Sequence, residues 1–509
     1  MCGFRQLSNF YGEAATTILY SIYQCFHPIS KQNERSMNIL PVTLSLIASF
    51  LSANTIVGLP ATITKEGLTF GWIIFTFPIS MFLVSYFFVP VTYNLKVVDV
   101  FVYLELRFSH VMQKVGAFMF CTLQVIYLSI VLRGPGIIFE ELSGFPEEES
   151  IVLVGVVCSL YTALGGMKAG IYIEAFQSIT MFLGLLVVVI TTYSTNSTDV
   201  LQAAMANQNE TLFFQTEDSS KYSIQSVLIG ATVLYTAIYA VNQSQVQRYA
   251  ACTSLKKAQI SLWLTSPGLI IVIILCCLFG LQMLAHNIES EDMDKAVGKF
   301  LMERIDMDGV VGLFVAGIFS ATMSSFSCGL SATNKVFSKN LLPKFNFGHR
   351  KTEIVHSVIA FLIGSLCTGI ATLLSQGILR ASLFIYGSLC CPILGVVILG
   401  IFFPWTNKNA VYLAIGITVP FIITYYIIQQ NVENWPAINI LWYGPITVTM
   451  VIIISILGSK AMGFQDPSTI SCNLLSPFIL KILNKSPKYQ KNISQEQARM
   501  WNDDKESTV

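Results

Sequence analysis

The sequence predicts an all-α polytopic membrane protein. The chain has 509 residues, of which 53% are hydrophobic and only 12% are charged, whereas soluble domains carry about 25% charged residues. Apolar stretches of about 20 residues, the length that crosses the hydrocarbon of a bilayer, recur along the chain, and they indicate about 13 spans. The formal net charge of +1 gives no sign of nucleic-acid binding.

The first element is the weakest. Within the N-terminal segment 1–38 we expect a short, polar first span at 13–28, and no cleavable signal peptide, because residues 1–12 lack an apolar core. Of the twelve cysteines only Cys2 is expected outside the membrane on the extracellular side, so no disulfide framework is predicted.

An amphipathic connector is expected at 97–110. Further spans are expected at 39–61, 69–93, 111–133, 150–164, 168–194, 223–245, 258–285, 309–334, 353–375, 378–403, 410–428 and 440–463. The Lys-rich tail, 464–509, is expected to be cytosolic and poorly ordered.

The span at 39–61 is unusual because its centre is polar. Four polar residues are followed there by a glycine and a proline: Ser49, Ser52, Asn54, Thr55, Gly58 and Pro60. Unpaired backbone in lipid costs several kcal/mol per group, so a broken helix is tolerated only where the freed groups line a cavity or hold a ligand. We expect one half-helix to end near Leu51 and a second to begin near Ala53. The freed carbonyls would suit a small hard cation and the freed amides an anion. An unbroken span with small polar residues packed against its neighbours remains the alternative at this point.

A second polar run lies inside the span at 223–245 and just beyond it. Residues 235–248 read YTAIYAVNQSQVQR, which suggests another interrupted helix. Interrupted segments at corresponding positions of two halves point to a binding site near the bilayer midplane.

Two further spans carry polar groups that such a site would use. Ala321, Ser324 and Ser325 lie at i, i+3 and i+4 and so share one helix face. The hydroxyls of the two serines could offer oxygen ligands to a cation, or the three small residues could serve only close helix packing. Glu174 falls about a turn and a half into the span at 168–194. An ionisable group at that depth is a functional candidate, unless it is an interfacial carboxylate paired with Lys168.

The charges of the loops predict the orientation. With the N-terminus outside and the tail inside, most of the 30 Lys and Arg fall on the cytosolic side, and Arg248 is expected in an inner loop. The loop 195–222 is then extracellular, and it carries glycan acceptor sequences at Asn196 and Asn209. We expect a multi-pass protein of the plasma membrane.

Four segments together resemble the sodium:solute symporter family: SLIASFLSANTIVG, YTALGGMKAGIYIEAFQ, NQSQVQR and GLFVAGIFSATMSS. The resemblance extends from about Asn38 to Gly463, and the runs YLELRF and SLIASFLSA are most similar to the branch of sodium-coupled monocarboxylate, multivitamin and iodide transporters. It implies a leucine-transporter-like fold with two inverted five-helix repeats, at 39–194 and 223–403. Two C-terminal spans within 404–463 would follow.

The resemblance also implies a sodium site. Its ligands would be the backbone oxygens and hydroxyls of two distant spans: Ala48, Leu51, Ala321, Ser324 and Ser325. Glu174 and Ser327 match positions linked in some members to sodium release or a second sodium. The chain departs from the family pattern in having Glu174 in place of Asp, Arg133 in place of Tyr, and non-family residues at Cys390-Cys391 and Ser338-Lys339.

The expected function is sodium-coupled import of a small organic solute, a monocarboxylate anion. Asn54 and Thr55 would hydrogen-bond the carboxylate at the start of the second half-helix, and Tyr235 and Tyr239 would wall the apolar end of the solute. No covalent chemistry is implied, so we expect neither an enzyme nor any cofactor besides sodium as the coupling ion. The alternatives are a vitamin, iodide or sugar transporter, a non-transporting sensor, and a sodium-leak channel.

Arg133 has two interpretations. It could draw anions from outside, but we favour a snorkelling anchor paired with Glu140.

Overall fold

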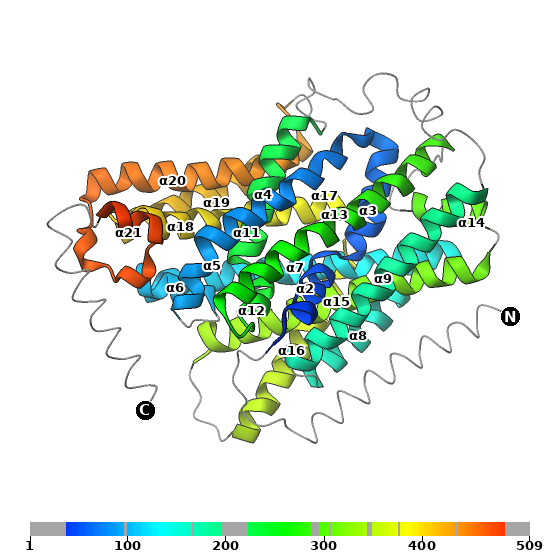
Figure 1. The fold of residues 1–509 in the computed structure, drawn as a ribbon, viewed down its shortest axis with the longest axis horizontal. Coiled ribbons are helices and arrows are strands. Elements are labelled where there is room, and N and C mark those ends of the chain that lie inside the picture. Colours follow the sequence, from blue (N-terminus) through cyan, green and yellow to red (C-terminus); the bar gives the residue numbers. More distant parts are fainter. Residues whose placement is uncertain are drawn as a thin grey trace.

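The computed structural model describes residues 37–95, 99–164, 167–195, 222–286, 295–305, 307–343, 349–374, 377–432 and 435–483, and throughout these ranges the regular elements are helices (Figure 1). The first part comprises α2 (Ile39–Phe50), α3 (Ala53–Glu66), η1 (Leu68–Phe75), α4 (Thr76–Leu83), η2 (Val84–Phe88), α5 (Val89–Asn94), α6 (Val100–Arg107), α7 (His110–Ser143), α8 (Glu147–Leu164) and α9 (Met167–Thr195). The second comprises η4 (Ser226–Ala231), α11 (Thr232–Val241), α12 (Gln243–Tyr249), α13 (Leu255–Ala285), α14 (Ala296–Arg304), α15 (Asp308–Val336), η5 (Phe337–Leu341), α16 (His349–Ala371), α17 (Ile378–Ile385), η6 (Tyr386–Cys390), α18 (Cys391–Phe402), α19 (Lys408–Asn431), η7 (Ile440–Trp442), α20 (Tyr443–Met462), η8 (Pro467–Thr469), η9 (Cys472–Leu474) and α21 (Pro477–Leu483).

The spans expected after residue 38 are confirmed as helical. Within the described residues, 9 helices are long and apolar enough to cross a membrane, and 2 further pairs qualify although each is bent at a break. The span expected at 150–164 is α8, which begins with three glutamates, Glu147 to Glu149. The expected first span at 13–28, Cys2, Asn196 and Asn209 lie outside the described residues.

The two broken helices lie at the centre of the bundle. The half-helix α2 packs against α9, α12, α13 and α15, and α3 packs against α7, α13 and α17. In Figure 1, α19 and α20 lie together at one side of the bundle, whereas α8 and α16 pair at another. The helices that surround the breaks are therefore contributed by segments far apart in the sequence.

Glycine permits two close contacts of α3. A Cβ added at Gly134 of α7 would lie 2.5 Å from the Cβ of Ala53, the first residue of α3, and one added at Gly58 of α3 would lie 2.8 Å from the Cβ of Leu379 in α17. No side chain fits at either point without moving the helices, so these glycines fix how α3 sits between α7 and α17.

The segment after α20 folds back onto the bundle, which corrects part of the expectation for the tail. Arg107 at the end of α6 is buried and donates hydrogen bonds to the carbonyls of Gly400, Phe403 and Pro404 at 3.2 Å each. It also donates to Oε1 of Gln465 at 3.3 Å. Residues 464–483 are tied to α6, whose Arg107 and Tyr103 donate to the Gln465 side chain and the Leu474 carbonyl, and to α18, where the N–H of Ser476 donates to the carbonyl of Ile401 at 3.2 Å. A hydropathy pattern does not reveal these contacts.

Candidate functional site

The first broken helix has its break where the sequence predicts it. α2 ends at Phe50 and α3 starts at Ala53, and the two axes are bent by 54°. Leu51 and Ser52 between them are extended and buried. The last turn of α2 and the first turn of α3 leave carbonyls and amides without the usual intrahelical partners, although the N–H groups of Thr55 and Ile56 bond the carbonyl of Ser52. The side chain of Ser52 does not cap α3. The break therefore presents oxygens on one side and N–H groups on the other.

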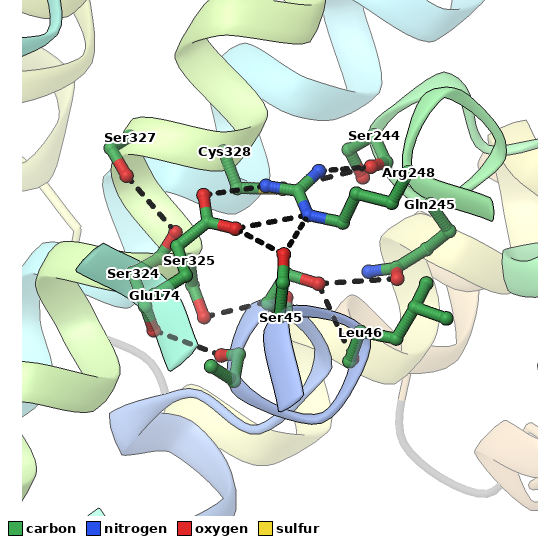
Figure 2. Close-up of polar contacts among 12 residues, drawn as sticks. Ser45, Leu46, Glu174, Ser244, Gln245, Arg248, Ser324, Ser325, Ser327 and Cys328 are labelled. Carbon is green, nitrogen blue, oxygen red and sulfur yellow. Dashed lines mark hydrogen bonds and ion pairs between the residues drawn. The ribbon is translucent and has the colours of Figure 1, made fainter. Parts of the chain in front are cut away.

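Serines of α15 contact the carbonyls just before this break (Figure 2). The hydroxyl of Ser324 lies 2.9 Å from the carbonyl oxygen of Ala48 and 2.9 Å from that of Ala321. The hydroxyl of Ser325 lies 3.5 Å from the carbonyl oxygen of Ser49. Four of the five expected sodium ligands thus come together, and Leu51, the fifth, lies fully buried in the break itself.

This group of hydroxyl and carbonyl oxygens has the chemistry that a hard cation requires. The Ser324 hydroxyl donates to Ala48 and Ala321, and rotation of the hydroxyl would turn a lone pair toward a cation instead. Ser327 lies one turn away and donates to the carbonyl of Ser324 at 3.3 Å.

Glu174 forms a buried ion pair with Arg248, and the side chain of Lys168, the other base considered for it, lies outside the described ones. Glu174 Oε1 is 2.6 Å from Arg248 Nη2, and the two side chains are 3% and 4% exposed. Nε of Arg248 donates to Oε2 of Glu174 at 3.1 Å and to the hydroxyl of Ser45 at 2.8 Å. The Ser45 hydroxyl donates to Oε2 of Glu174 at 2.5 Å. The expectation that Arg248 belongs to an inner loop is wrong, because α12 carries it into the bundle, where it joins α2 and α9 (Figure 2).

The second interrupted helix is also confirmed, with α11 and α12 bent by 61° around Asn242. The side chain of Asn242 accepts a hydrogen bond from the backbone N–H of Ser244 at 3.0 Å and from Nε2 of Gln124 at 3.1 Å. Its amide nitrogen donates to the hydroxyl of Tyr386 at 3.3 Å. Gln124 and Tyr386 were not predicted as site residues, although a buried glutamine inside the apolar span 111–133 was a signal that could have found Gln124.

The four expected substrate residues lie on two sides of the first break. Asn54 donates from Nδ2 to the hydroxyl of Ser382 in α17 at 2.8 Å, while its Oδ1 is buried without a partner among the described residues. Thr55 beside it is half-buried.

The two tyrosines lie against the aromatic ring of Phe50 at the end of α2. The ring of Tyr235 lies edge-on to Phe50 at 5.3 Å and stacks on Phe77 at 4.7 Å. Tyr239 lies 5.6 Å from Phe50, and its hydroxyl is buried without a partner among the described residues. No described contact joins Asn54 to either tyrosine, so the structure brings each pair close to the break but not to each other.

Arg133 does not pair with Glu140. Its Nε lies 3.1 Å from Oε1 of Glu147, and its side chain is only 8% exposed. Glu140 instead accepts from Nζ of Lys295 at 2.7 Å, and this hydrogen bond is the main cause of the raised pKa of Lys295. Arg133 is therefore engaged by a carboxylate and is poorly placed to attract anions.

The described cysteines are free thiols, and Cys276, Cys390 and Cys391 are buried as packing residues. No group of three or more His, Cys, Asp or Glu among the described residues is arranged to hold a metal ion.

Comparison with known proteins decides the family. The profile of the sodium:solute symporter family matches residues 32–415. The chain belongs to the sodium:solute symporter family. It is 34% identical to the sodium-coupled monocarboxylate transporter 1 of Mus musculus over 391 residues, which is 74% of this chain and 64% of that one. It is 32% identical to a putative sodium-dependent multivitamin transporter of Drosophila melanogaster over 74% of this chain and 66% of that one. The human sodium/iodide cotransporter is 29% identical over 86% of this chain and 70% of its own length.

A solved structure with the same fold is the outward-open state of a Na⁺-coupled sialic acid symporter. The TM-score is 0.78 at 19% identity, and the match covers 91% of this chain and 99% of that one. The fold of this symporter-family chain is thus leucine-transporter-like, as expected. The chain spans less than two thirds of the length of the matched monocarboxylate and multivitamin relatives. Its family and its structural neighbours are secondary transporters and not enzymes.

Proposed function

We propose that the chain is a sodium-coupled symporter of the plasma membrane that imports a monocarboxylate anion by alternating access. The N-terminus lies outside and the tail in the cytosol, so the loop 195–222 is extracellular and carries glycans at Asn196 or Asn209. The two inverted repeats are 39–194 and 223–403.

The observation that carries this proposal is the contact between the Ser324 hydroxyl and the Ala48 carbonyl, 2.9 Å apart. Two oxygen atoms that could ligate a cation, one from each of two distant spans, thus lie together at the end of α2. Sodium bound by Ala48, Leu51, Ala321, Ser324 and Ser325 would hold α2 and α15 together. Because the ion binds only when both helices contribute, its occupancy shifts the equilibrium between the two orientations of the cavity.

We assign one sodium to this site and none to Glu174 and Ser327. Glu174 already has a full counter-charge in Arg248 at 2.6 Å and a hydroxyl from Ser45. A cation there would have to displace a guanidinium in a buried setting, where the separation of an ion pair is strongly unfavourable.

The solute carboxylate binds at the start of α3, near Asn54 and Thr55, with Tyr235 and Tyr239 against its apolar part. A helix N-terminus favours an anion by roughly 0.3–1 kcal/mol when exposed and up to about 2 when partly buried. The second candidate is a vitamin, iodide or sugar solute in the same site. This candidate is favoured by the multivitamin and iodide relatives.

The sodium site is tested by removing its hydroxyls. Ser324→Ala and Ser325→Ala should each raise the half-saturating sodium concentration about tenfold if one lost ligand costs about 1.4 kcal/mol, and excess sodium should restore uptake. Ser331→Ala, further along α15, is the matched control and should change the sodium dependence little. Unaltered sodium dependence in a double mutant that reaches the cell surface would refute the site.

The solute is tested by a panel of radiolabelled compounds offered with and without sodium: lactate, butyrate, biotin, pantothenate, iodide, choline and glucose. Concentrative, sodium-dependent uptake of lactate or butyrate is expected. Uptake of glucose alone contradicts the anion proposal, and saturable binding without accumulation indicates a sensor. A sodium current that no solute alters indicates a leak channel.

A further inference from the structure

A buried carboxylate joins the start of α6 to η5, the helical turn that continues α15. The side chain of Asp99, the N-cap of α6, is only 2% exposed. Its Oδ1 accepts a hydrogen bond from the backbone N–H of Phe101 at 2.9 Å, and its Oδ2 accepts one from Nδ2 of Asn340 in η5 at 3.0 Å. Lys339, whose side chain is 51% exposed, lies 3.5 Å from the same Oδ2. Hydrogen bonds to an ionised acceptor are strong, so this carboxylate holds α6 and η5 together.

The same set of hydrogen bonds reaches α7 and the second broken helix. Nε2 of Gln113 in α7 donates to Oδ1 of Asn340 at 3.0 Å. The backbone N–H of Val100, the first residue of α6, donates to Oε1 of Gln243 at 3.1 Å. Gln243 is the first residue of α12 and directly follows the break at Asn242. Buried hydrogen bonds therefore connect α6 with α7, with η5 and with α12.

Of these elements, α12 is also bound to α2, the first half of the other broken helix. Nε of Arg248 in α12 donates to the hydroxyl of Ser45 at 2.8 Å. The hydroxyl of Ser49 donates to Oε1 of Gln245 at 3.2 Å. In alternating access, one side of the bundle opens when one group of helices moves away from the rest. α2 and α12 form such a group, whereas α6 packs on α7 outside it.

We propose that α6 is a brace that keeps α12 in the position closed to the cytosol, and that Asp99 and Asn340 anchor this brace to the bundle. The N–H of Val100 holds Gln243 through one neutral hydrogen bond, which breaks when the cavity opens inward, because entering water then hydrates both freed groups. Asp99 is a positioning residue, since it acts through α6. The inference rests on the proposed function for the cytosolic position of α6 and for the inward opening of the cavity.

The test uses a native thiol that reports the separation of α12 from α15. Cys328 of α15 is buried, and its Sγ donates to the carbonyl of Ser244 in α12 at 3.8 Å. A membrane-impermeant maleimide is applied to the cytosolic face of inside-out vesicles, and labelling of the peptide that contains Cys328 is quantified by mass spectrometry. In the native protein with sodium this labelling should be slow, because sodium favours the state in which α2 lies against α15.

Two single variants should loosen the brace. Asn340→Asp places a second carboxylate beside Asp99, and Gln243→Met removes the acceptor for the Val100 N–H. Each should raise the rate of Cys328 labelling about tenfold without sodium, and saturating sodium should lower the rate again.

A double variant should restore the native behaviour. Asp99→Asn combined with Asn340→Asp keeps one amide and one carboxylate but exchanges their positions, and an asparagine oxygen still caps the start of α6. Its labelling rate should lie within about twofold of the native rate, which shows that the two side chains act as a pair. Asn409→Asp adds a carboxylate at an exposed position at the start of α19 and is the matched control, which should leave the rate unchanged.

The outcomes separate this inference from the proposed function, because the labelling needs no solute. Native labelling rates in Asn340→Asp and Gln243→Met overturn the brace even if the protein takes up lactate with sodium. Faster labelling that sodium does not lower shows loosened packing and also overturns it, as does a double variant that labels as fast as Asn340→Asp alone. If the expected labelling pattern is found but no solute is taken up with sodium, the proposed function fails while the control of access by α6 stands.

Discussion

The buried pair of Glu174 and Arg248 is a residue-scale feature with a clear energetic signature. Removal of one partner leaves an uncompensated charge in the bundle, which costs about 3–5 kcal/mol. We therefore expect Glu174→Gln and Arg248→Gln each to lower the melting temperature of the detergent-purified protein sharply. The double variant should recover most of the loss, because no unpaired charge remains.

A partly exposed ion pair is the control for this comparison. Lys295 and Glu140 are 2.7 Å apart, but each is 34% exposed, and exposed pairs contribute about 0–1 kcal/mol. Lys295→Gln should therefore change the melting temperature little. If the double variant of Glu174 and Arg248 lowered the melting temperature by the sum of the two single losses, the two charges would not depend on each other.

At the same scale, the sequence identifies which residues are unusual better than it identifies their partners. The depth of Glu174 marks it as functional or paired, and that interpretation needs no structure. Its partner was missed because an arginine near the end of a span is normally assigned to a loop. Only the bend at Asn242, which turns α12 back into the bundle, brings Arg248 to the carboxylate.

At the scale of elements, the position of α3 depends on Gly134 of α7. A Cβ there would lie 2.5 Å from the Cβ of Ala53, so Gly134→Ala must push the start of α3 away from α7. We expect a loss of uptake at least tenfold, measured per transporter at the cell surface. Such a loss would point to the displacement of α3 and not to a weaker helix α7, because alanine is intrinsically better than glycine in a helix by about 0.8–1.0 kcal/mol.

Gly416→Ala is the matched control, since a Cβ at Gly416 of α19 meets no atom within 4 Å. Uptake by Gly416→Ala should equal that of the native protein. Normal uptake by Gly134→Ala would show that α3 tolerates the displacement and does not hold the solute.

Helix breaks were predictable from sequence, and short helices outside the spans were not. Polar residues, Gly58 and Pro60 in an apolar span indicated the first break to within a residue. By contrast, no element was expected between residues 285 and 309, where α14 lies, although Val297 and Leu301 bury one face of this helix. A helix of nine residues is too short to give a clear periodic pattern, and the packing of α14 against α7 and α3 supplies the rest of its stability.

At the scale of the whole molecule, the proposed orientation predicts where glycans and tags are accessible. Enzymatic deglycosylation should increase the electrophoretic mobility of the protein, and replacing Asn196 and Asn209 together with Gln should abolish that shift. A tag at the C-terminus should stain only after permeabilisation of the cells. Staining of intact cells would contradict the orientation.

The hydrogen bonds that Arg107 donates bear on how far the chain can be shortened for purification. Hydropathy alone suggests that a fusion partner or protease site can follow Gly463, where the last long helix ends. Such a chain would lose the acceptor that Gln465 gives to Arg107 and the one that Leu474 gives to Tyr103. At roughly 0.5–1.5 kcal/mol for each hydrogen bond, it should melt at a lower temperature and aggregate sooner in detergent than a chain cut after Leu483. Equal thermal stability of the two chains would show that 464–483 adds nothing to the fold. A lower stability of the chain cut at Gly463 would mean that a well-behaved chain must extend past Leu474, beyond the last segment that a hydropathy plot would keep.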